Sequence, residues 1–315
     1  MSERARNVGG VTEPDLDGRR SDHEVDDHDI VIKEGPRGWR RTVLEVVRRP
    51  VAVASLLILV VVVVMAIFGQ WLTPYGINEV NISRRLEGPS AQHWFGTDEL
   101  GRDILTRVIA SASVSVRVSV IAVAIALVVG VSLGLFAGFF GGWLDSVIMR
   151  SQDVMFAFPE ILLALAIVAI LGPGVTTATI AIGIVYIPVF ARVTRASALS
   201  VRTETYVRAS KSLGAGPLRQ MFSHVLPNIS APIIVQTSLS LAFAVLSEAG
   251  LSFLGFGLPP DTPDWGIDLA RGQDYIRRAW WLIAIPGAMV SLVTLAFSML
   301  GESLSEILNP RLAEV

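Results

Sequence analysis

Cysteine is absent from this sequence, and histidine is scarce. Without cysteine the chain has no disulfide framework, no thiolate metal site and no thiol nucleophile. The four histidines are too scattered for the spacing of a metal site: His23, His28, His93 and His224. No Gly-x-x-x-x-Gly-Lys-Ser/Thr phosphate loop occurs, and residues 255–257 lack the third glycine of a dinucleotide-binding loop. We therefore expect no catalytic residue, no metal and no cofactor on this chain.

Charge is the second scarce feature. Charged residues make up 17% of the 315 residues, whereas soluble domains carry about 25%. Hydrophobic residues account for 52% of the chain, and the mean hydropathy is +0.56. Long windows of the sequence contain no charge at all: 50–78, 118–144, 161–191, 220–247 and 279–301. Because a helix needs about 20 apolar residues to cross a bilayer, these windows predict a membrane protein.

The charge-free windows also predict the number of spans. Four of them hold one span each. The window 161–191 is split by Leu171-Gly172-Pro173-Gly174, a turn that cannot continue a helix, so it holds the outer parts of two helices. We predict an all-α polytopic protein with six transmembrane helices and a short inner loop at 141–153. A stripe of small residues in the second span predicts close packing with a neighbouring helix: Gly130, Gly134 and Gly138.

Basic residues indicate the orientation of the chain. Arginines precede the first span: Arg37, Arg40, Arg41, Arg48 and Arg49. Basic residues also dominate the loop predicted after the fourth span: Arg192, Arg195, Arg202, Arg208, Lys211 and Arg219. Lysine and arginine are enriched in cytoplasmic loops, so both signals place the N- and C-termini in the cytoplasm. The expected location is the cell (inner or plasma) membrane.

The predicted spans divide the chain into five parts. Residues 1–45 form a cytoplasmic tail that we expect to be largely disordered, because its first 35 residues are acidic with almost no large apolar residue. The other parts are the first transmembrane helix (46–70), an extracytoplasmic segment (71–110), a five-helix transmembrane core (111–303) and a cytoplasmic C-terminal tail (304–315). Within the core we expect an outer hairpin at 171–174 and an outer loop at 256–278.

The inner loop of the core, residues 203–227, has the signals of two short helices. Thr203 suits the N-cap of a helix that runs through Leu213, and Gly214 suits the left-handed position just past its end. Pro217 suits the first position of a second helix ending at about His224. Its mixture of apolar and basic side chains suits a groove on a partner protein and an anionic lipid surface equally well.

The spacing in this loop resembles the EAA loop of ABC-importer permeases, in which Glu-Ala-Ala precedes a glycine and, farther on, Leu-Pro. The matching residues are Ala209, Ser210, Gly214 and Leu226-Pro227, whereas Arg208 stands where the family has glutamate. The resemblance implies that the loop docks on a separate ATPase subunit, which favours protein over lipid. It implies these coupling residues: Tyr206, Arg208, Ala209, Ser210, Lys211, Gly214, Leu218, Arg219, His224, Leu226 and Pro227.

Further motifs are similar to the dipeptide/oligopeptide/nickel permease family, specifically to the C-type partner of its two permeases. They are His-Trp-Phe-Gly-Thr-Asp-Glu-Leu-Gly-Arg-Asp at 93–103, Gly-Gly-Trp-Leu-Asp at 141–145, Ser-Glu-Ala-Gly-Leu-Ser-Phe-Leu-Gly at 247–255 and Pro-Asp-Trp-Gly at 263–266. The resemblance covers residues from about 50 to 310. It implies a type I ABC-importer permease fold and a heterodimer with a second homologous permease. It also implies two ATPase subunits that carry ATP and Mg, an extracytoplasmic substrate-binding protein, and no nucleic acid.

Several ionisable residues outside the loop are candidate functional residues. One group lies near the outer end of the second span and the outer mouth: Asp98, Arg102, Asp103 and Trp265. The three charged residues cap and solvate the helix end, and Trp265 shapes a loop or short helix at the outer mouth; alternatively, the four residues contact the binding protein or form an outer gate. Arg117 and Glu248 lie at or near membrane depth, where they either line the pore or have a structural partner or an interfacial position. Glu160 follows a proline near the inner end of the third span, where we expect it to reach water.

The function predicted is that of a non-catalytic permease subunit of an ATP-driven importer. The resemblance leaves dipeptides, oligopeptides, nickel complexes and other solutes open as substrates, with peptides favoured. A secondary transporter would show an internal repeat and broken-helix ion sites, and the sequence reveals neither. An intramembrane enzyme would need paired catalytic groups at membrane depth, and none is recognisable in the sequence.

Overall fold

The computed structural model describes residues 39–308, with side chains from residue 44 onward. Strand pairing in this part is limited to an isolated bridge between Thr97 and Asp103, which confirms the predicted all-α class. The helices are α1 (Trp39–Arg48), α2 (Pro50–Leu72), α3 (Ile104–Phe140), α4 (Gly142–Phe156), α5 (Glu160–Leu171), α6 (Val175–Val201), α7 (Thr205–Ser212), α8 (Pro217–Gln220), the π-helical turn η3 (Met221–Val225), α9 (Leu226–Asn228), α10 (Ser230–Phe253), α11 (Trp265–Gly272) and α12 (Trp281–Leu308). Short 3-10 turns lie at Ile82–Arg84 (η2) and Gln273–Tyr275 (η4).

The membrane spans follow the charge-free windows. Within the described part of the chain, 5 helices are long and apolar enough to cross a membrane: α2, α3, α6, α10 and α12. Helices α4 and α5 pass the same test only as a pair, and the chain bends by 92° between them. Counting this pair as one broken span gives the predicted total of six.

The third span differs from the prediction. Residues 141–153, expected as an inner loop, contain most of α4 instead. Helix α5 has only 12 residues, which cover about 18 Å, so it needs α4 to complete a crossing of about 30 Å. The break precedes α5 at Phe158-Pro159, because proline disfavours a helical conformation in the residue before it. A broken helix was one of the features that the sequence did not reveal.

The predicted boundaries shift by a few residues. The first span is α2, Pro50–Leu72, and the residues just before it form the separate helix α1. Residues 39–45, assigned to the tail, therefore belong to a helix. The segment predicted at 71–110 ends earlier, because α3 begins at Ile104. The remainder of the N-terminal tail and residues 309–315 lie outside the described residues.

The glycine stripe brings α3 against α6, as predicted. A Cβ atom added at Gly134 would lie 2.3 Å from the carbonyl oxygen of Ala191. At Gly130 it would lie 2.6 Å from the carbonyl oxygen of Ile187, and at Gly138 2.8 Å from a side-chain carbon of Ala198. The two backbones are thus closer than any side chain would allow. Small residues permit this approach, and close packing is the main attraction between helices in lipid.

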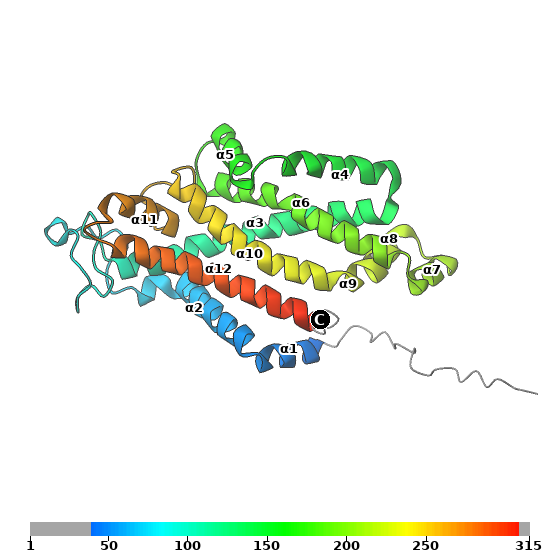
Figure 1. Cartoon of the computed structure of the whole chain (residues 1–315), viewed down its shortest axis with the longest axis horizontal. Helices are drawn as coiled ribbons and strands as arrows, with labels where there is room; N and C mark the ends of the chain where they lie inside the picture. Colours follow the sequence, from blue (N-terminus) through cyan, green and yellow to red (C-terminus); the bar gives the residue numbers. More distant parts are fainter. Residues whose placement is uncertain (1–38, 309–315) are drawn as a thin grey trace, which may run out of the picture. The chain divides into compact units, whose positions relative to one another are not determined.

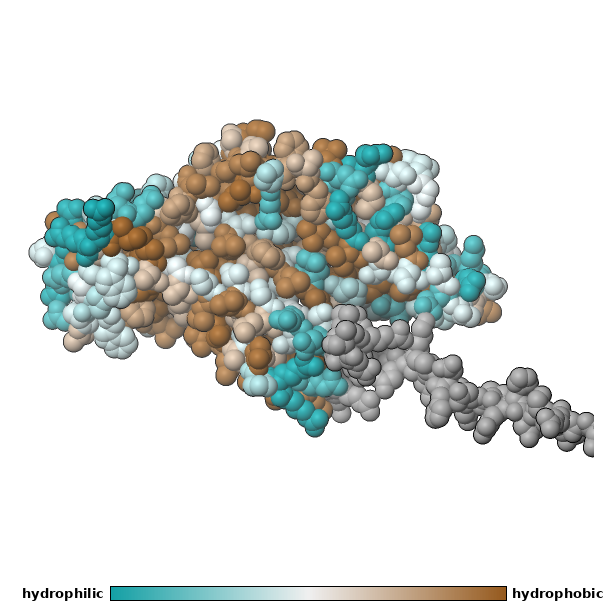
Figure 2. Space-filling model, viewed as in Figure 1, coloured by the Kyte–Doolittle hydropathy of each residue, from teal (hydrophilic) through white to brown (hydrophobic). Residues whose placement is uncertain are grey.

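The two ends of the helix bundle differ from its middle. Figure 1 places α7 and α8 at one end, which we call the α7 end, and α11 at the other, which we call the α11 end. Figure 2 shows apolar residues over the middle of the helices and hydrophilic residues gathered towards both ends. An apolar band of this kind is required of a bundle that is embedded in a bilayer.

The contact between α3 and α6 predicts the effect of adding one methyl group. Gly134→Ala should destabilise the protein by about 1 to 3 kcal/mol, because its Cβ overlaps the backbone of α6. Gly287→Ala is the matched control, since its nearest neighbour would be a Leu269 methyl at 3.6 Å. The melting temperature in detergent should fall for Gly134→Ala and be unchanged or slightly higher for Gly287→Ala. Equal melting temperatures would contradict the close packing.

Candidate docking surface and polar groups of the bundle

The segment 205–228 at the α7 end folds into two short helical parts around a glycine. Helix α7 ends at Ser212, and Gly214 adopts the left-handed φ of +84° that was predicted for it. Pro217 is the first residue of α8, also as predicted. The N-cap prediction was wrong: Glu204 precedes α7, and the Thr203 hydroxyl donates to the carbonyl of Ser200 instead. The helical run beyond Pro217 continues through η3 and α9 to Asn228.

A small apolar cluster holds this segment against the long helices. From the segment come Val207, Met221 and Val225, all buried. They pack with Leu135 of α3 and Ala198 of α6. The elbow between the two parts is closed by hydrogen bonds from Ala215 N to Ser210 O at 3.0 Å and from Gln220 Nε2 to Ala215 O at 2.6 Å. The segment is therefore fixed in shape and attached to two spans.

The opposite side of the segment is exposed and mixes apolar with basic groups. Leu213 is 88% exposed, Leu218 60% and Phe222 53%. The predicted coupling residues that are exposed are Tyr206, Arg208, Ala209, Lys211, Gly214, Leu218, Arg219 and Pro227. The half-buried ones are Ser210, His224 and Leu226. We call this exposed side of residues 205–228 the docking surface, since exposed apolar groups gathered in one patch mark a contact with another molecule.

Three arginines attributed to the inner loop lie elsewhere. Helix α6 extends to Val201, so Arg192 and Arg195 are helical residues that pair with α4. Arg192 Nη2 lies 2.7 Å from Asp153 Oδ1, and Arg195 Nη2 lies 2.6 Å from Asp145 Oδ2. Arg202 donates to the carbonyls of Gly138 and Phe139 at the end of α3. These arginines join α3, α4 and α6, and the basic charge of the docking surface comes from other residues: Arg208, Lys211 and Arg219.

The charged residues of the predicted outer group are buried and form ion pairs with one another and with His93. Asp103 caps α3 as expected, accepting a 2.8 Å hydrogen bond from Thr106 N, and its other oxygen lies 2.9 Å from His93 Nδ1. Asp98 Oδ2 accepts from Arg102 Nε at 2.5 Å. All three predicted residues are at most 4% exposed, so the expectation that they are solvated was wrong. Burial also leaves them no surface with which to contact a binding protein in this conformation.

Trp265 is likewise buried and connects α11 to α3. It is the first residue of α11, and its Nε1 donates to the carbonyl of Val108 on α3 at 3.1 Å. The Nε1 of Trp281 donates to the carbonyl of Thr97 at 3.2 Å. Both indoles fix the α11 end to the long helices, so Trp265 shapes this end and does not form a surface contact.

Sequence reasoning missed an ion pair that secures α11. Arg107 of α3 donates to Asp268 Oδ1 through Nε at 2.9 Å and through Nη2 at 2.5 Å, and both side chains are buried. Burial raises the pKa of Asp268 to about 6, an effect that Arg107 opposes and Asp264 reinforces. Arg107 lies just outside the charge-free window of the second span, and this position was the only signal available.

The two candidates at membrane depth are not brought together. Glu248 is buried, accepts a 3.2 Å hydrogen bond from Ser252, and interacts with Asp264, the N-cap of α11. It therefore has the structural partner that was one of the two predicted outcomes. Arg117 is exposed on α3.

A polar cluster lies at the break of the third span. Glu160, the first residue of α5, accepts hydrogen bonds on Oε1 from the Tyr186 hydroxyl of α6 and, at 2.8 Å, from the Ser247 hydroxyl of α10. The prediction that Glu160 simply reaches water missed these two partners. Neither hydroxyl was identified from the sequence, since single serine and tyrosine residues within charge-free windows give no signal of contact.

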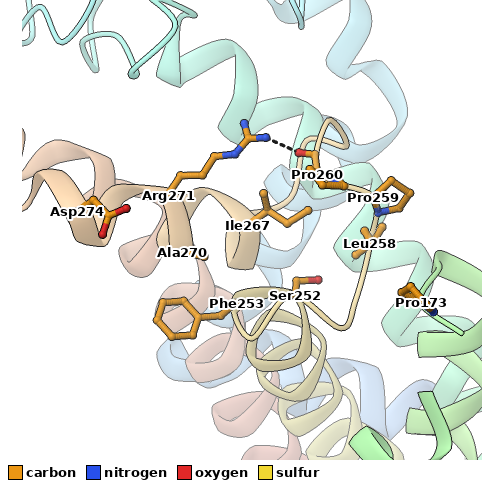
Figure 3. A pocket seen from close by; sticks show the side chains of 11 residues that line it. Pro173, Ser252, Phe253, Leu258, Pro259, Pro260, Ile267, Ala270, Arg271 and Asp274 are labelled. Atoms are coloured by element: carbon orange, nitrogen blue, oxygen red, sulfur yellow. Dashed lines mark hydrogen bonds between the residues drawn. The ribbon is translucent and has the colours of Figure 1, made fainter. Parts of the chain in front are cut away.

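The α11 end also contains a cavity of about 570 Å³. Figure 3 shows it between Phe253 at the end of α10, the proline-rich loop at Pro259 and Pro260, and α11. Arg271 closes one side by donating to the carbonyl of Pro260 at 2.7 Å. Within the described residues, no group of three or more histidine, cysteine, aspartate or glutamate side chains is placed to hold a metal ion.

Comparisons with known proteins cover nearly all of these elements. The family described as "Binding-protein-dependent transport system inner membrane component" matches residues 130–314, and the "N-terminal TM domain of oligopeptide transport permease C" matches residues 39–89. The chain is 44% identical to the dipeptide transport system permease protein DppC of Alkalihalophilus pseudofirmus, over 87% of this chain and 90% of that protein. It is 45% identical to the di/tripeptide transport system permease protein DppC of Pseudomonas aeruginosa, over 83% and 88%. It is 39% identical to the glutathione transport system permease protein GsiD of Escherichia coli, over 87% and 89%.

The raised pKa of Asp268 predicts a pH dependence of stability. The folded-state pKa of about 6 lies above the ordinary value of 3.8, so between these values the folded protein holds the proton more tightly than the unfolded chain. The contribution of Asp268 to stability is therefore complete below about pH 4 and is lost as the pH rises through 6. The loss amounts to roughly 3 kcal/mol.

Asp268→Asn removes this titration. The melting temperature of the wild type minus that of the variant should decrease from pH 4 to pH 6 and stay level above pH 7. Asp274→Asn makes the same chemical change at an exposed position of the same end and serves as the control. A difference between wild type and Asp268→Asn that stays constant across this range would contradict the assignment.

Proposed function

Because the chain belongs to the family of binding-protein-dependent transport system inner membrane components, it is a permease subunit of an ABC importer, and we propose that its solute is a di- or oligopeptide. The family predicted from the sequence motifs is thereby confirmed. Support for a peptide comes from three relatives that are 39 to 45% identical to this chain. Their names describe transport of dipeptides, of di- and tripeptides, and of glutathione. The matches extend over most of each relative's length.

The proposed assembly contains three further kinds of subunit. One six-span bundle forms only one wall of a pore, so a second homologous permease supplies the other half as a heterodimer. Two ATPase subunits bind ATP and Mg, which leaves this chain without a catalytic role. An external binding protein delivers the solute. The division into a first helix and a five-helix core is part of the same proposal, supported by separate family matches at 39–89 and 130–314.

The main support for coupling to the ATPase is the docking surface. It combines exposed Leu213, Leu218 and Phe222 with basic side chains on a segment whose other side is anchored. An exposed apolar patch on a rigid elbow fits a cleft on a protein. We place the α7 end in the cytoplasm, because Arg208, Lys211 and Arg219 lie there and basic residues favour that side. The α11 end and its cavity then face the outside.

The anchoring explains how ATPase closure reaches the spans. A displacement of the docking surface moves Met221 and Val225, which pack on Leu135 of α3 and Ala198 of α6. Close-packed side chains transmit such a displacement because they leave no space to absorb it. The α3 and α6 helices would therefore move with the docking surface.

Leu218→Glu tests the docking surface directly. The side chain is 60% exposed, so the fold should be unaffected, whereas a charge within an apolar contact should weaken binding to the ATPase by about tenfold or more. Peptide-stimulated ATP hydrolysis and peptide uptake by the reconstituted complex should fall together. The measurement is co-purification with the ATPase subunits, followed by uptake into proteoliposomes.

Val80→Glu is the matched control at the opposite end, since Val80 is 53% exposed. It should leave ATPase binding unchanged. Normal ATPase binding by Leu218→Glu would show that the partner docks elsewhere. Failure of the wild-type complex to take up any peptide would instead refute the proposed substrate.

Arg208 provides an independent test, because its charge is opposite to that of the family pattern. Arg208→Gln should weaken ATPase binding slightly, and Arg208→Glu should weaken it by about three- to tenfold, since the cognate cleft is matched to a positive charge. The differences should shrink at high salt, where exposed charges are screened. Surface plasmon resonance at two salt concentrations measures this order. Equal affinities for the three proteins would show that this position makes no contact.

A further inference from the structure

The break of the third span lies near the middle of the membrane. Tyr186, which contacts Glu160 at the break, is 11 residues after Val175, the first residue of α6. At a rise of 1.5 Å per residue, it is about 17 Å from that end of the span. Half of a hydrocarbon core is about 15 Å. The non-helical residues between α4 and α5 are therefore at the depth where a bilayer contains no water.

The residues at the break are all exposed in the single chain, although they lie at this depth. Residues 156–162 include Phe158, Pro159 and Glu160, and all seven are exposed in the described chain. Lipid cannot satisfy irregular backbone, so such segments occur at membrane depth only against protein or against a water-filled path. The side of the bundle that carries the break therefore faces the second permease or the translocation path, not lipid.

The carboxylate of Glu160 is oriented but only half satisfied. Tyr186 and Ser247, from two different spans, both donate to Oε1. Within residues 44–308, no hydrogen bond reaches Oε2, and no arginine, lysine or histidine forms a salt bridge with this side chain. A carboxylate at membrane depth needs a compensating cation or water. The described part of the chain thus presents a fixed, accessible negative group and supplies no cation to it.

We propose that Glu160 binds the ammonium group of the peptide as it passes through the pore, with Tyr186 and Ser247 positioning the carboxylate. This inference rests on the proposed function, because it takes a peptide as the solute. The N-terminal ammonium is common to peptides of any side-chain composition, so one carboxylate can serve all of them. The other carboxylate at membrane depth, Glu248, is buried against Ser252 and Asp264 and is not accessible.

Uptake by the reconstituted complex gives the first readout. Proteoliposomes hold both permeases and the ATPases, with ATP inside and the binding protein outside. Glu160→Gln should lower the uptake of a free-amine dipeptide by about tenfold, because it removes a charged hydrogen bond. Glu160→Asp should retain most of the uptake. Glu302→Gln, the same change on an exposed position of α12, is the control and should match the wild type.

Direct binding gives a readout that a structural role would not change. Saturation-transfer NMR with the permease–ATPase complex, without the binding protein, should detect the dipeptide in preference to its desamino analogue. Glu160→Gln should abolish that preference while the two permeases still co-purify. Unchanged uptake by Glu160→Gln overturns the inference, and so does a wild-type complex without the preference. Loss of co-purification would also overturn it, by showing that Glu160 pairs with a cation of the second permease. Peptide uptake by the wild type would leave the proposed function intact in each of these cases.

Discussion

The close contact between α3 and α6 is the interaction on which the rest of the structure depends. Gly130, Gly134 and Gly138 remove the side chains that would separate the two backbones, and the main apolar core lies along the same contact. At the α7 end both helices supply residues to the cluster that anchors the docking surface. At the α11 end α3 holds α11 through an ion pair and an indole. In lipid no hydrophobic force draws helices together, so packing of this kind must position both ends.

The α11 end is held by polar contacts that are buried, whereas the α7 end is held by apolar ones. Arg107 pairs with Asp268 and Arg102 pairs with Asp98, both away from water, and removing one partner from such a pair leaves a buried charge. That arrangement favours one geometry of the loops around the cavity. The apolar anchoring at the other end has no such directional contacts, and its close packing makes the docking surface move together with α3 and α6. The two ends of the bundle are thus held in different ways, the α11 end by directional polar contacts and the docking surface by close apolar packing.

The sequence was most informative where one residue type has one structural meaning. Charge-free windows predicted the long spans, Gly214 predicted the elbow, and Asp103 predicted the cap of α3. It failed on α4, because a helix with Asp145, Arg150 and Asp153 resembles a loop until the arginines of α6 that pair with it are known. The ion pair of Arg107 with Asp268 was missed for the same cause, because the two residues are 161 positions apart in the sequence. The hydroxyl partners of Glu160 are also distant in the sequence. Hydropathy identifies the apolar segments of a sequence, but it does not identify which polar side chains form ion pairs or hydrogen bonds across the fold.

The pairing of α4 with α6 also connects the break of the third span to the docking surface. Arg195 and Arg192 tie α4 to the part of α6 that ends just before α7, and the guanidinium of Arg192 lies 4.0 Å from the ring centre of Phe156. Phe156 is the last residue of α4, and Glu160 begins α5. The α4 helix is therefore attached to the end of α6 that precedes α7, whereas α5 is attached through Glu160 to Tyr186 of α6 and Ser247 of α10. Both sides of the break are thus attached to α6, so a displacement of α6 reaches α4 and Glu160 together.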